Sequence, residues 1–215
     1  MLVRVSGVSF TYPRREDPVL RQVSFEVPSG AAVAIMGPSG SGKTTLLALM
    51  GGLLPLREGR VLAIDAHGQE HPVAAQATWV LQTVSLLPDR TAAHNVAVGA
   101  YSAGATPTEA RARAATCLTA VGLAGRELAP ARLLSGGEAQ RVATARALAS
   151  QRPIILADEP TGQLDAATSA VVIDALVTAR SGQTVLLVTH DREVAARCDL
   201  VFELRDGVIR PTVGP

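Results

Sequence analysis

Residues 37–45 read GPSGSGKTT, and this stretch decides the fold of the chain. It fits the pattern G-x-x-x-x-G-K-[ST] of a phosphate-binding loop, with Lys43 and Thr44 near its end. The apolar residues 31–36 precede the loop and residues 44–50 continue from its end, which predicts a strand, a loop and a helix. Glycine lets the loop backbone curl until successive N–H groups point at one anion. The residues expected to bind phosphate are Gly37, Pro38, Ser39, Gly40, Ser41, Gly42, Lys43, Thr44 and Thr45.

Lys43 is the only lysine in the chain, and the other residues counted with it as Lys or Arg are all arginine. An ammonium group is a compact point charge that fits inside a closed loop around one phosphate, whereas the planar, forked guanidinium group is too broad. We therefore expect Lys43 to reach the β- and γ-phosphates of a nucleotide. The hydroxyl of Thr44 is expected to bind Mg²⁺.

The composition is that of one folded domain. The chain has 215 residues, of which 47% are hydrophobic and 18% charged, and this balance argues against intrinsic disorder. The net charge of +1 gives no electrostatic argument for a nucleic-acid partner. No apolar run reaches the roughly 18 residues of a membrane-spanning helix, and the first residues lack the apolar stretch of a signal peptide. We therefore expect the protein to stay in the cytosol.

Strand and helix patterns alternate along the chain. Strands are predicted over residues 2–12, 19–27, 31–36, 61–64, 77–82, 153–158, 184–190, 201–204 and 208–210. Helices are predicted over about residues 106–121, 135–149, 165–180 and 191–198. Thr106 with Glu109 and Ser135 with Glu138 form capping boxes, and Asp165 is a third capping residue. Alternation of this kind around a phosphate loop predicts a largely parallel sheet with helices on both faces.

Two acidic residues, Asp158 and Glu159, end the apolar strand 153–158. Ligands of parallel sheets bind beyond the carboxyl ends of the strands. Asp158 is therefore placed to hold Mg²⁺, and Glu159 to act as general base on an attacking water. His190 ends the strand 184–190 and should reach the same edge, where it would hydrogen-bond the γ-phosphate. The sequence predicts that these three residues and the phosphate loop form one catalytic site.

A second pair of glycines lies in residues 134–138, LSGGE, at the start of the predicted helix 135–149. A hydroxyl, two bare backbone amides and a helix N-terminus form another anion-binding arrangement. With Gln140 and Arg141 following, this stretch resembles the LSGGQ-type signature of ATP-binding-cassette (ABC) ATPases, with Glu138 where Gln is commonest. The resemblance covers nearly the whole chain, and its motifs occur in the order found in the family.

The resemblance implies roles that the local patterns leave open. Tyr12 matches the aromatic residue that stacks on adenine, and Gln82 matches the glutamine that contacts Mg²⁺ or the attacking water. Asp165, in the stretch PTGQLD at residues 160–165, matches the D-loop, and His190 matches the switch histidine. The implied catalytic residues are Glu159, His190 and Lys43. The implied metal ligands are Thr44, Gln82 and Asp158. The implied cofactors are ATP and Mg²⁺.

The implied fold is α/β, a P-loop NTPase of the ABC type. It consists of a RecA-like mixed sheet core, an antiparallel β subdomain and a helical sub-lobe. Residues 1–215 are expected to form a single ABC ATPase domain. Its core is expected at about residues 1–82 and 152–215, and its helical sub-lobe at about residues 83–151.

The resemblance also implies a partner chain. In this family the signature of one copy closes over the phosphate loop of another copy, and the closed dimer buries two ATP molecules. Ser135, Gly136 and Gly137 are therefore expected to contact the γ-phosphate in trans. The partner is a second copy, in an ATP-dependent head-to-tail homodimer, or a paralogous ATPase.

Two phrases indicate a subgroup. PTGQLD at residues 160–165 and LLPDRTAAHNV at residues 86–96 are similar to the lipoprotein-release and macrolide-export group, whose members work with a separate membrane subunit. Such a permease would bind the segment 83–98 and hold the chain on the inner face of the cell membrane. Relatives that power uptake of amino acids or metals are also similar, and the cargo and the direction of transport depend on the permease.

Three other functional classes are compatible with parts of the sequence. The same ATPase is used in membrane complexes that signal to cell-wall hydrolases, which the sequence does not separate from transport. Soluble ABC ATPases of DNA repair carry long coiled-coil insertions, and those of translation carry two cassettes; neither feature is found in this sequence. A phosphate-loop kinase would have no reason to carry LSGGE.

Overall fold

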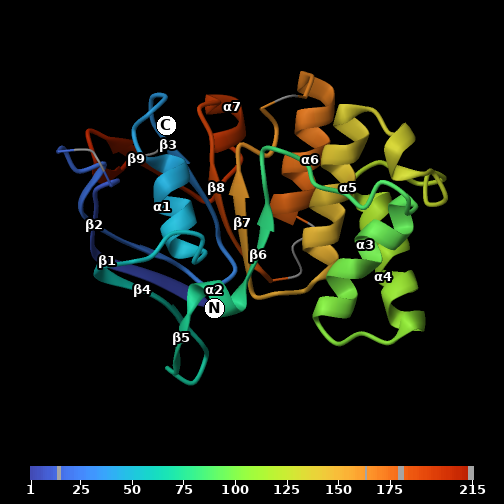
Figure 1. Ribbon diagram of the computed structural model, residues 1–215, viewed down its shortest axis with the longest axis horizontal. Helices are drawn as coiled ribbons and strands as arrows, with labels where there is room; N and C mark the ends of the chain where they lie inside the picture. The colour runs from blue at the N-terminus through green and yellow to red at the C-terminus, as the bar shows by residue number, and fades with distance from the viewer. Residues whose placement is uncertain (14–15, 163, 179–181, 213–215) are drawn as a thin grey trace.

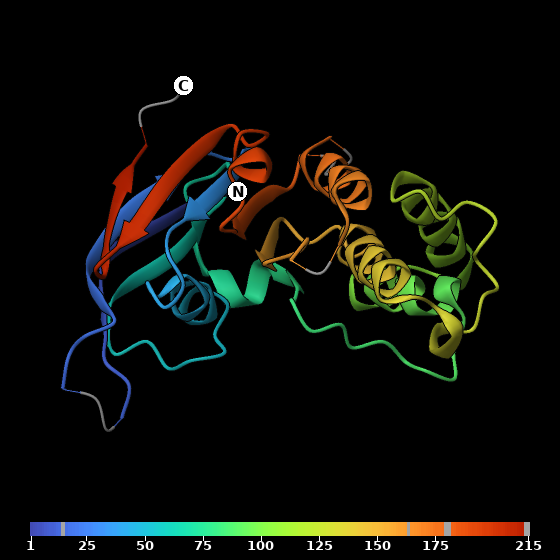
Figure 2. The same cartoon turned by 90° about the horizontal axis from the view of Figure 1, so that it is seen from above.

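The structure is a computed structural model that describes residues 1–13, 16–162, 164–178 and 182–212 (Figure 1). Two β-sheets and a group of helices make up the fold. An antiparallel sheet lies at one end of the molecule, and the helices α3 (Ala92–Ser102), α4 (Pro107–Ala120) and α5 (Gly136–Ala149) lie at the other (Figure 2). A larger mixed sheet lies between them. Residues from the antiparallel sheet and from the helices can therefore both reach the ends of its strands.

The larger sheet has six strands in the order β10-β9-β3-β8-β7-β6. Its strands are β3 (Ala32–Met36), β6 (Ala77–Val80), β7 (Ile154–Asp158), β8 (Thr184–Val188), β9 (Leu200–Arg205) and β10 (Val208–Pro211). All neighbouring pairs are parallel except β9 with β10. β7 and β8 are buried along their whole length, because other elements cover both faces of the sheet.

The smaller sheet is antiparallel and has the order β2-β1-β4-β5. Its strands are β1 (Leu2–Phe10), β2 (Leu20–Val27), β4 (Glu58–Ile64) and β5 (Glu70–Pro72). The helix α1 (Lys43–Met50) packs with this sheet and with one face of β3, β7 and β8 in one apolar cluster. This packing fixes the start of α1, and therefore the phosphate loop, against the large sheet.

The helices α3, α4 and α5 join α6 (Ala166–Thr178) and the other face of the large sheet in a second apolar cluster. Three short helices complete the described fold: α2 (Val73–Gln76), the 3₁₀ helix η1 (Ala131–Leu133) and α7 (Arg192–Ala195). Both predicted capping boxes are confirmed, at the starts of α4 and α5. Across the described residues, no helix combines the length and apolar character that crossing a membrane requires.

Several elements differ from the sequence prediction. The strand predicted over 77–82 ends at Val80, and the strand predicted over 184–190 ends at Val188, so Gln82 and His190 lie on loops beyond the sheet. The helix α3 was not predicted, and it begins inside the segment 83–98. The predicted helix end at Arg180, and Gln163 of the PTGQLD stretch, lie outside the described residues.

Candidate functional site

The phosphate loop joins β3 to α1, and two of its glycines occupy positions that a larger residue would disturb. Gly37 has φ 154°, and a Cβ there would lie 2.2 Å from the backbone oxygen of Leu204. Gly42 has φ 99°, and a Cβ there would lie 3.0 Å from the side chain of Val19. The Ser41 hydroxyl is buried and has no hydrogen-bond partner in the described part of the chain. The loop backbone is therefore held tightly against β9 and the start of β2.

Lys43 is the first residue of α1 and is 8% exposed. Its ammonium group donates hydrogen bonds to the backbone oxygens of Gly37, at 2.8 Å, and Pro38, at 3.0 Å. The charge is therefore held by the loop itself, close to any anion that the loop encloses. A forked guanidinium group would have to fit into the same closed space.

Thr44 and Asp158 join the loop to the end of β7. The Thr44 hydroxyl donates to Oδ1 of Asp158 at 3.0 Å. Burial raises the pKa of Asp158, and the negative charge of Glu159 adds to the effect, whereas the bond from Thr44 and the charge of Lys43 oppose it. A buried carboxylate beside a hydroxyl is a donor set that fits Mg²⁺, since this ion prefers oxygen ligands.

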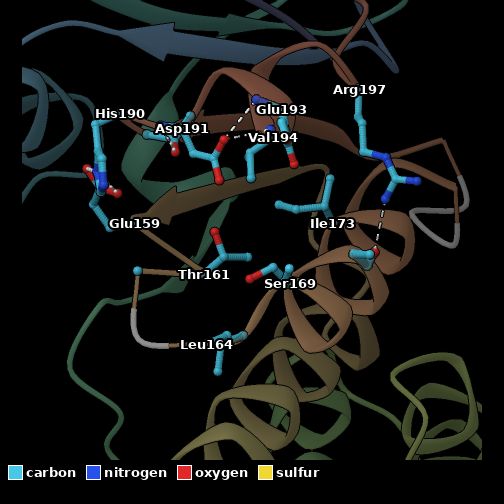
Figure 3. Close-up of a pocket in the computed structure, with 14 residues that line it drawn as sticks. Glu159, Thr161, Leu164, Ser169, Ile173, His190, Asp191, Glu193, Val194 and Arg197 are labelled. Atoms are coloured by element: carbon cyan, nitrogen blue, oxygen red, sulfur yellow. Dashed lines mark hydrogen bonds and ion pairs between the residues drawn. The ribbon is translucent and has the colours of Figure 1, made fainter.

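Glu159 and His190 face each other at the carboxyl edge of the large sheet, and Figure 3 shows the imidazole ring beside the carboxylate. Nδ1 of His190 lies 3.1 and 3.0 Å from the two carboxylate oxygens of Glu159. The side chain of Glu159 is 15% exposed and that of His190 is 70% exposed. Glu159 has φ 45°, a left-handed conformation that costs free energy in a residue other than glycine. Its N–H donates to the backbone oxygen of Val188, which ties it to the end of β8.

Tyr12 approaches the loop from the antiparallel sheet. Its hydroxyl lies 3.0 Å from Oγ1 of Thr45, and its ring packs edge-on against Phe10 with the ring centres 4.9 Å apart. Tyr12 is partly exposed and lines the cavity described next, so a ligand can reach it. The sequence did not predict the hydrogen bond to Thr45, because a pairing between two distant elements leaves no local pattern.

Most of the predicted site residues meet around one cavity of about 560 Å³. Its lining residues are Tyr12, Val19, Ser39, Gly40, Gly42, Lys43, Thr44, Thr45, Gln82, Glu159 and His190. Glu159 and His190 also line a neighbouring cavity of about 520 Å³ that extends along α6 and α7 (Figure 3). The phosphate loop, the residue that follows β7 and the loops after β6 and β8 therefore line one cavity.

The predicted signature residues lie elsewhere. Ser135, Gly136 and Gly137 are not among the residues that line the 560 Å³ cavity. Ser135 caps α5 by accepting from the N–H of Glu138 at 3.2 Å, and Ser135 and Gly136 are exposed. A Cβ on Gly136 would meet no atom of the described chain within 4 Å. This segment is therefore presented outward by the start of the helix.

Asp165 also lies outside the group of residues around the 560 Å³ cavity. Its two carboxylate oxygens accept from the N–H and the hydroxyl of Thr168, at 2.9 and 2.7 Å. These bonds lower the pKa of Asp165. The prediction that Asp165 caps the helix that follows it, α6, is confirmed.

Sequence reasoning did not predict the contacts by which two polar residues of α5 hold the segment after β6. Gln140 donates to the backbone oxygen of Leu81 at 3.3 Å, and Arg146 donates to that of Ser85 at 2.9 Å. No local sequence pattern marks these contacts, because they join residues about 60 positions apart in the chain. Their bonds couple the loop that carries Gln82 to α5.

Asn95 is a third polar residue that the sequence did not single out. It lies on α3, is fully buried, and bonds to both the N–H and the oxygen of Leu87. A buried amide that satisfies a loop backbone fixes that loop, because breaking the bonds would leave polar groups unpaired. The segment after Gln82 is therefore held from α3 as well as from α5.

The fold and this site define a P-loop NTPase with an attached helical lobe, and comparison with known proteins gives its family. The model of the ABC transporter family matches residues 20–162, more than half of the chain. The chain belongs to this family as an ABC ATPase, and the resemblance inferred from LSGGE is confirmed.

Curated relatives refine the assignment. The chain is 44% identical to the lipoprotein-releasing system ATP-binding protein LolD 2 of Rhodospirillum rubrum, over 96% of this chain and 94% of that protein. It is 40% identical to the macrolide export ATP-binding/permease protein MacB of Agrobacterium fabrum, over 97% of this chain and 34% of that longer protein. The similarity to the lipoprotein-release and macrolide-export group is therefore confirmed.

Solved structures agree with the fold. A dimeric structure of MJ0796, described as a bacterial ABC transporter cassette, has a TM-score of 0.84 and 34% identity, covering 98% of this chain and 97% of its own. A dimeric post-hydrolysis state of the same cassette, bound to ADP and phosphate, has a TM-score of 0.82 and 35% identity, covering 98% and 97%. The predicted α/β ABC ATPase fold is confirmed.

Proposed function

We propose that this ABC ATPase is the ATP-binding and ATP-hydrolysing subunit of a transporter, which dimerises around two ATP molecules and drives a separate membrane permease. One observation carries the proposal. Lys43, Thr44 and Gln82 line the same cavity as the acid–imidazole pair of Glu159 and His190. A phosphate loop and a general base at one cavity are what hydrolysis of a nucleotide requires.

ATP binding is assigned to the loop and to Tyr12. The backbone N–H groups of residues 37–45 would surround the phosphates, and Lys43 would turn from the loop oxygens to the β- and γ-phosphates. Tyr12 would stack on the adenine. The bond between Tyr12 and Thr45 links the adenine site to the phosphate loop, so both ends of the nucleotide would be held by connected residues.

Mg²⁺ would be held by Thr44, Asp158 and Gln82. When bound, this ion would neutralise phosphate charge and orient the γ-phosphate. The Thr44 hydroxyl and the Asp158 carboxylate are already 3.0 Å apart, which supports their assignment to one cation site. Asp158 would bind the ion in its ionised form, which burial makes costly in the absence of a cation.

In the hydrolytic step Glu159 is the general base. It accepts a proton from the attacking water as the water oxygen bonds to the γ-phosphorus and the bond to the ADP oxygen breaks. His190 steadies the carboxylate of Glu159 through Nδ1 and would reach the γ-phosphate with its other nitrogen. Lys43 stabilises the charge that develops on the transferred group.

The signature would complete the site from a second chain. Ser135, Gly136 and Gly137 would contact the γ-phosphate of the partner's ATP in a head-to-tail dimer, with Asp165 at the interface. The dimer would form with a second copy or with a paralogue. The exposure of the helix start supports this arrangement, since it leaves the anion-binding groups open to another molecule.

The membrane partner would bind beside the Gln82 loop, at the segment 83–98. This segment is tied to α5 by Arg146, so movement of the loop with ATP would move the helical lobe at about residues 83–151. That lobe would move relative to a core at about residues 1–82 and 152–215. The chain would lie on the cytoplasmic face of the membrane, and its relatives favour lipoprotein release or export as the process served.

A Glu159→Gln variant tests the assignment of the base. The amide keeps the shape of the side chain but cannot accept the proton, so we expect ATP hydrolysis to fall about 100-fold or more. ATP binding, measured with a fluorescent ATP analogue, should stay within about twofold of the unmodified chain. A matched control is Glu193→Gln, because Glu193 lines only the neighbouring cavity. Hydrolysis by the Glu159→Gln chain at the unmodified rate would exclude Glu159 as the base.

A further inference from the structure

Glu138 places a negative charge beside the segment that the proposed function brings to the partner's γ-phosphate. It lies three residues after Ser135, in the first turn of α5, and its side chain is 20% exposed. A carboxylate at this position would repel the phosphate and offset the positive end of the helix dipole. The signature attracts an anion more strongly if another group neutralises this charge.

We propose that Arg126 is a positioning residue for the signature. By pairing with Glu138 it neutralises the negative charge at the start of α5, so that this helix start can bind the γ-phosphate of the partner's ATP. This role rests on the proposed function, because it assumes that the signature closes on a nucleotide in trans. Arg126 lies outside the signature motif, in the loop between α4 and η1.

The two carboxylate oxygens of Glu138 have separate partners. Oε2 accepts from the N–H of Ser135 at 2.9 Å and completes the capping box. Oε1 lies 2.9 Å from Nη2 of Arg126. The bond from Ser135 lowers the pKa of Glu138, and the charge of Arg126 adds to this effect, so the carboxylate is ionised at neutral pH. Arg126 therefore meets a full negative charge and offsets it at the exposed helix start.

The backbone around Arg126 is fixed by hydrogen bonds on both sides. Its own N–H donates to the oxygen of Leu123, and its oxygen accepts from the N–H of Ala129. The oxygen of the next residue, Glu127, accepts from the N–H of Ala93 at the start of α3. The side chain of Arg126 is 47% exposed, but its attachment point is ordered. An ordered attachment point lowers the entropy cost of the ion pair.

Loss of the Arg126–Glu138 pair should have a small effect at each signature, but a dimer contains two signatures. An exposed ion pair changes an equilibrium constant by only about twofold to fivefold. A dimer with two nucleotides contains two signatures, so the factors for the two sites multiply. Loss of the arginine should therefore weaken ATP-dependent dimerisation about fourfold to 25-fold at low ionic strength, and much less at high salt.

The test measures ATP-dependent dimerisation by sedimentation velocity, with whole chains that all carry Glu159→Gln to prevent hydrolysis. Arg126→Gln should weaken dimerisation at low salt, and Glu138→Gln alone should leave it equal or tighter. The double variant Arg126→Gln/Glu138→Gln should recover the parent's affinity. A glutamine still completes the capping box, so the rescue separates charge from helix capping. A merely structural role for Arg126 would not be rescued in this way.

The matched control is Arg132→Gln. Arg132 is also exposed and close to the signature in the chain, but its carboxylate partner is Asp89, at 3.8 Å. This variant should dimerise like the parent, and a loss equal to that of Arg126→Gln would show a general effect of positive charge and overturn the specific pairing.

Two further outcomes separate this role from the proposed function. If Arg126→Gln dimerises like its parent, or if Glu138→Gln does not rescue it, Arg126 has no such role and the proposed function stands. If the Glu159→Gln parent forms no dimer with ATP at any protein concentration, the proposed ATP-bound dimer is wrong, and the role of Arg126 is wrong with it.

Discussion

The two glycine-rich segments of this chain, residues 37–45 and 134–138, resemble each other in sequence but differ in how they are held. The first is fixed from within, since Lys43 bonds to its own loop and Thr44 to Asp158. The second is held by its capping box and by the ion pair of Glu138 with Arg126, and its hydroxyl and first glycine are exposed. The first segment is a nearly complete binding site within this chain. The second is an exposed surface that would bind only when another molecule approaches it.

Glycine shows the difference most clearly. At Gly37 a side chain would strike the backbone of β9, so the fold of this chain itself demands glycine. At Gly136 a side chain would meet no described atom within 4 Å, so this chain gives no reason for glycine. If the residue matters there, the reason is close approach by another molecule.

The largest effect is expected from Lys43→Arg, which keeps the charge and changes its shape. The guanidinium group does not fit the closed loop, so ATP affinity should fall about 100-fold, close to the fall for Lys43→Met. Equilibrium binding of a fluorescent ATP analogue measures this. Near-normal affinity for the arginine variant would show that charge alone suffices, and that the single lysine of the chain has no steric cause.

Ser135→Arg should impair ATP hydrolysis but not ATP binding, because it changes only the second glycine-rich segment. The side chain would fill the exposed helix start, so ATP hydrolysis should fall at least about tenfold, because the closed dimer no longer forms. ATP binding to the single chain should change less than about twofold, since Ser135 is outside the cavity. Parallel titrations of hydrolysis and binding test this. Equal losses in both would place Ser135 in the site of its own chain.

A pair of alanine variants tests the interpretation of the glycines. Gly37→Ala should destabilise the chain by about 2–4 kcal/mol through the clash with Leu204 and lower Tm by several degrees. Gly136→Ala should leave Tm equal or raise it by up to roughly 3 °C, since alanine favours a helix. The same variant should weaken ATP-dependent dimerisation. A stable Gly37→Ala chain, or an unstable Gly136→Ala chain, would break the contrast.

The smallest effect is expected on thermal stability, when Asp158→Asn is compared with the unmodified chain in the absence of nucleotide and metal. Burial raises the pKa of Asp158 above its ordinary value of 3.8, so the native chain holds this proton more tightly than the unfolded chain. The destabilisation is therefore fully present above the raised pKa and disappears as the pH falls below about 3.8. At pH 7 the neutral amide should raise Tm slightly while abolishing hydrolysis. A lower Tm in calorimetry would contradict this view of the carboxylate.

The sequence predicted the parts whose chemistry is local. The strand, loop and helix around 37–45, the acids at the end of β7 and the capping boxes at Thr106 and Ser135 all depend on residues close in the chain, and the structure has these elements where the sequence places them. The bonds that Gln140 and Tyr12 make to other elements were not predicted, because those elements meet only after folding. The helix α3 was missed because Thr91 is a weak cap signal without an acid three residues later.

The central claim is that the two glycine-rich segments complete one site only when they come from different chains. Two labelled variants, both carrying Glu159→Gln, test it directly: one also carries Lys43→Ala and the other Ser135→Arg. Neither should dimerise alone with ATP. Mixed, they should associate when ATP is added, because the first supplies an intact signature and the second an intact loop. Association of the Glu159→Gln parent with ATP, but none in the mixture, would contradict the claim.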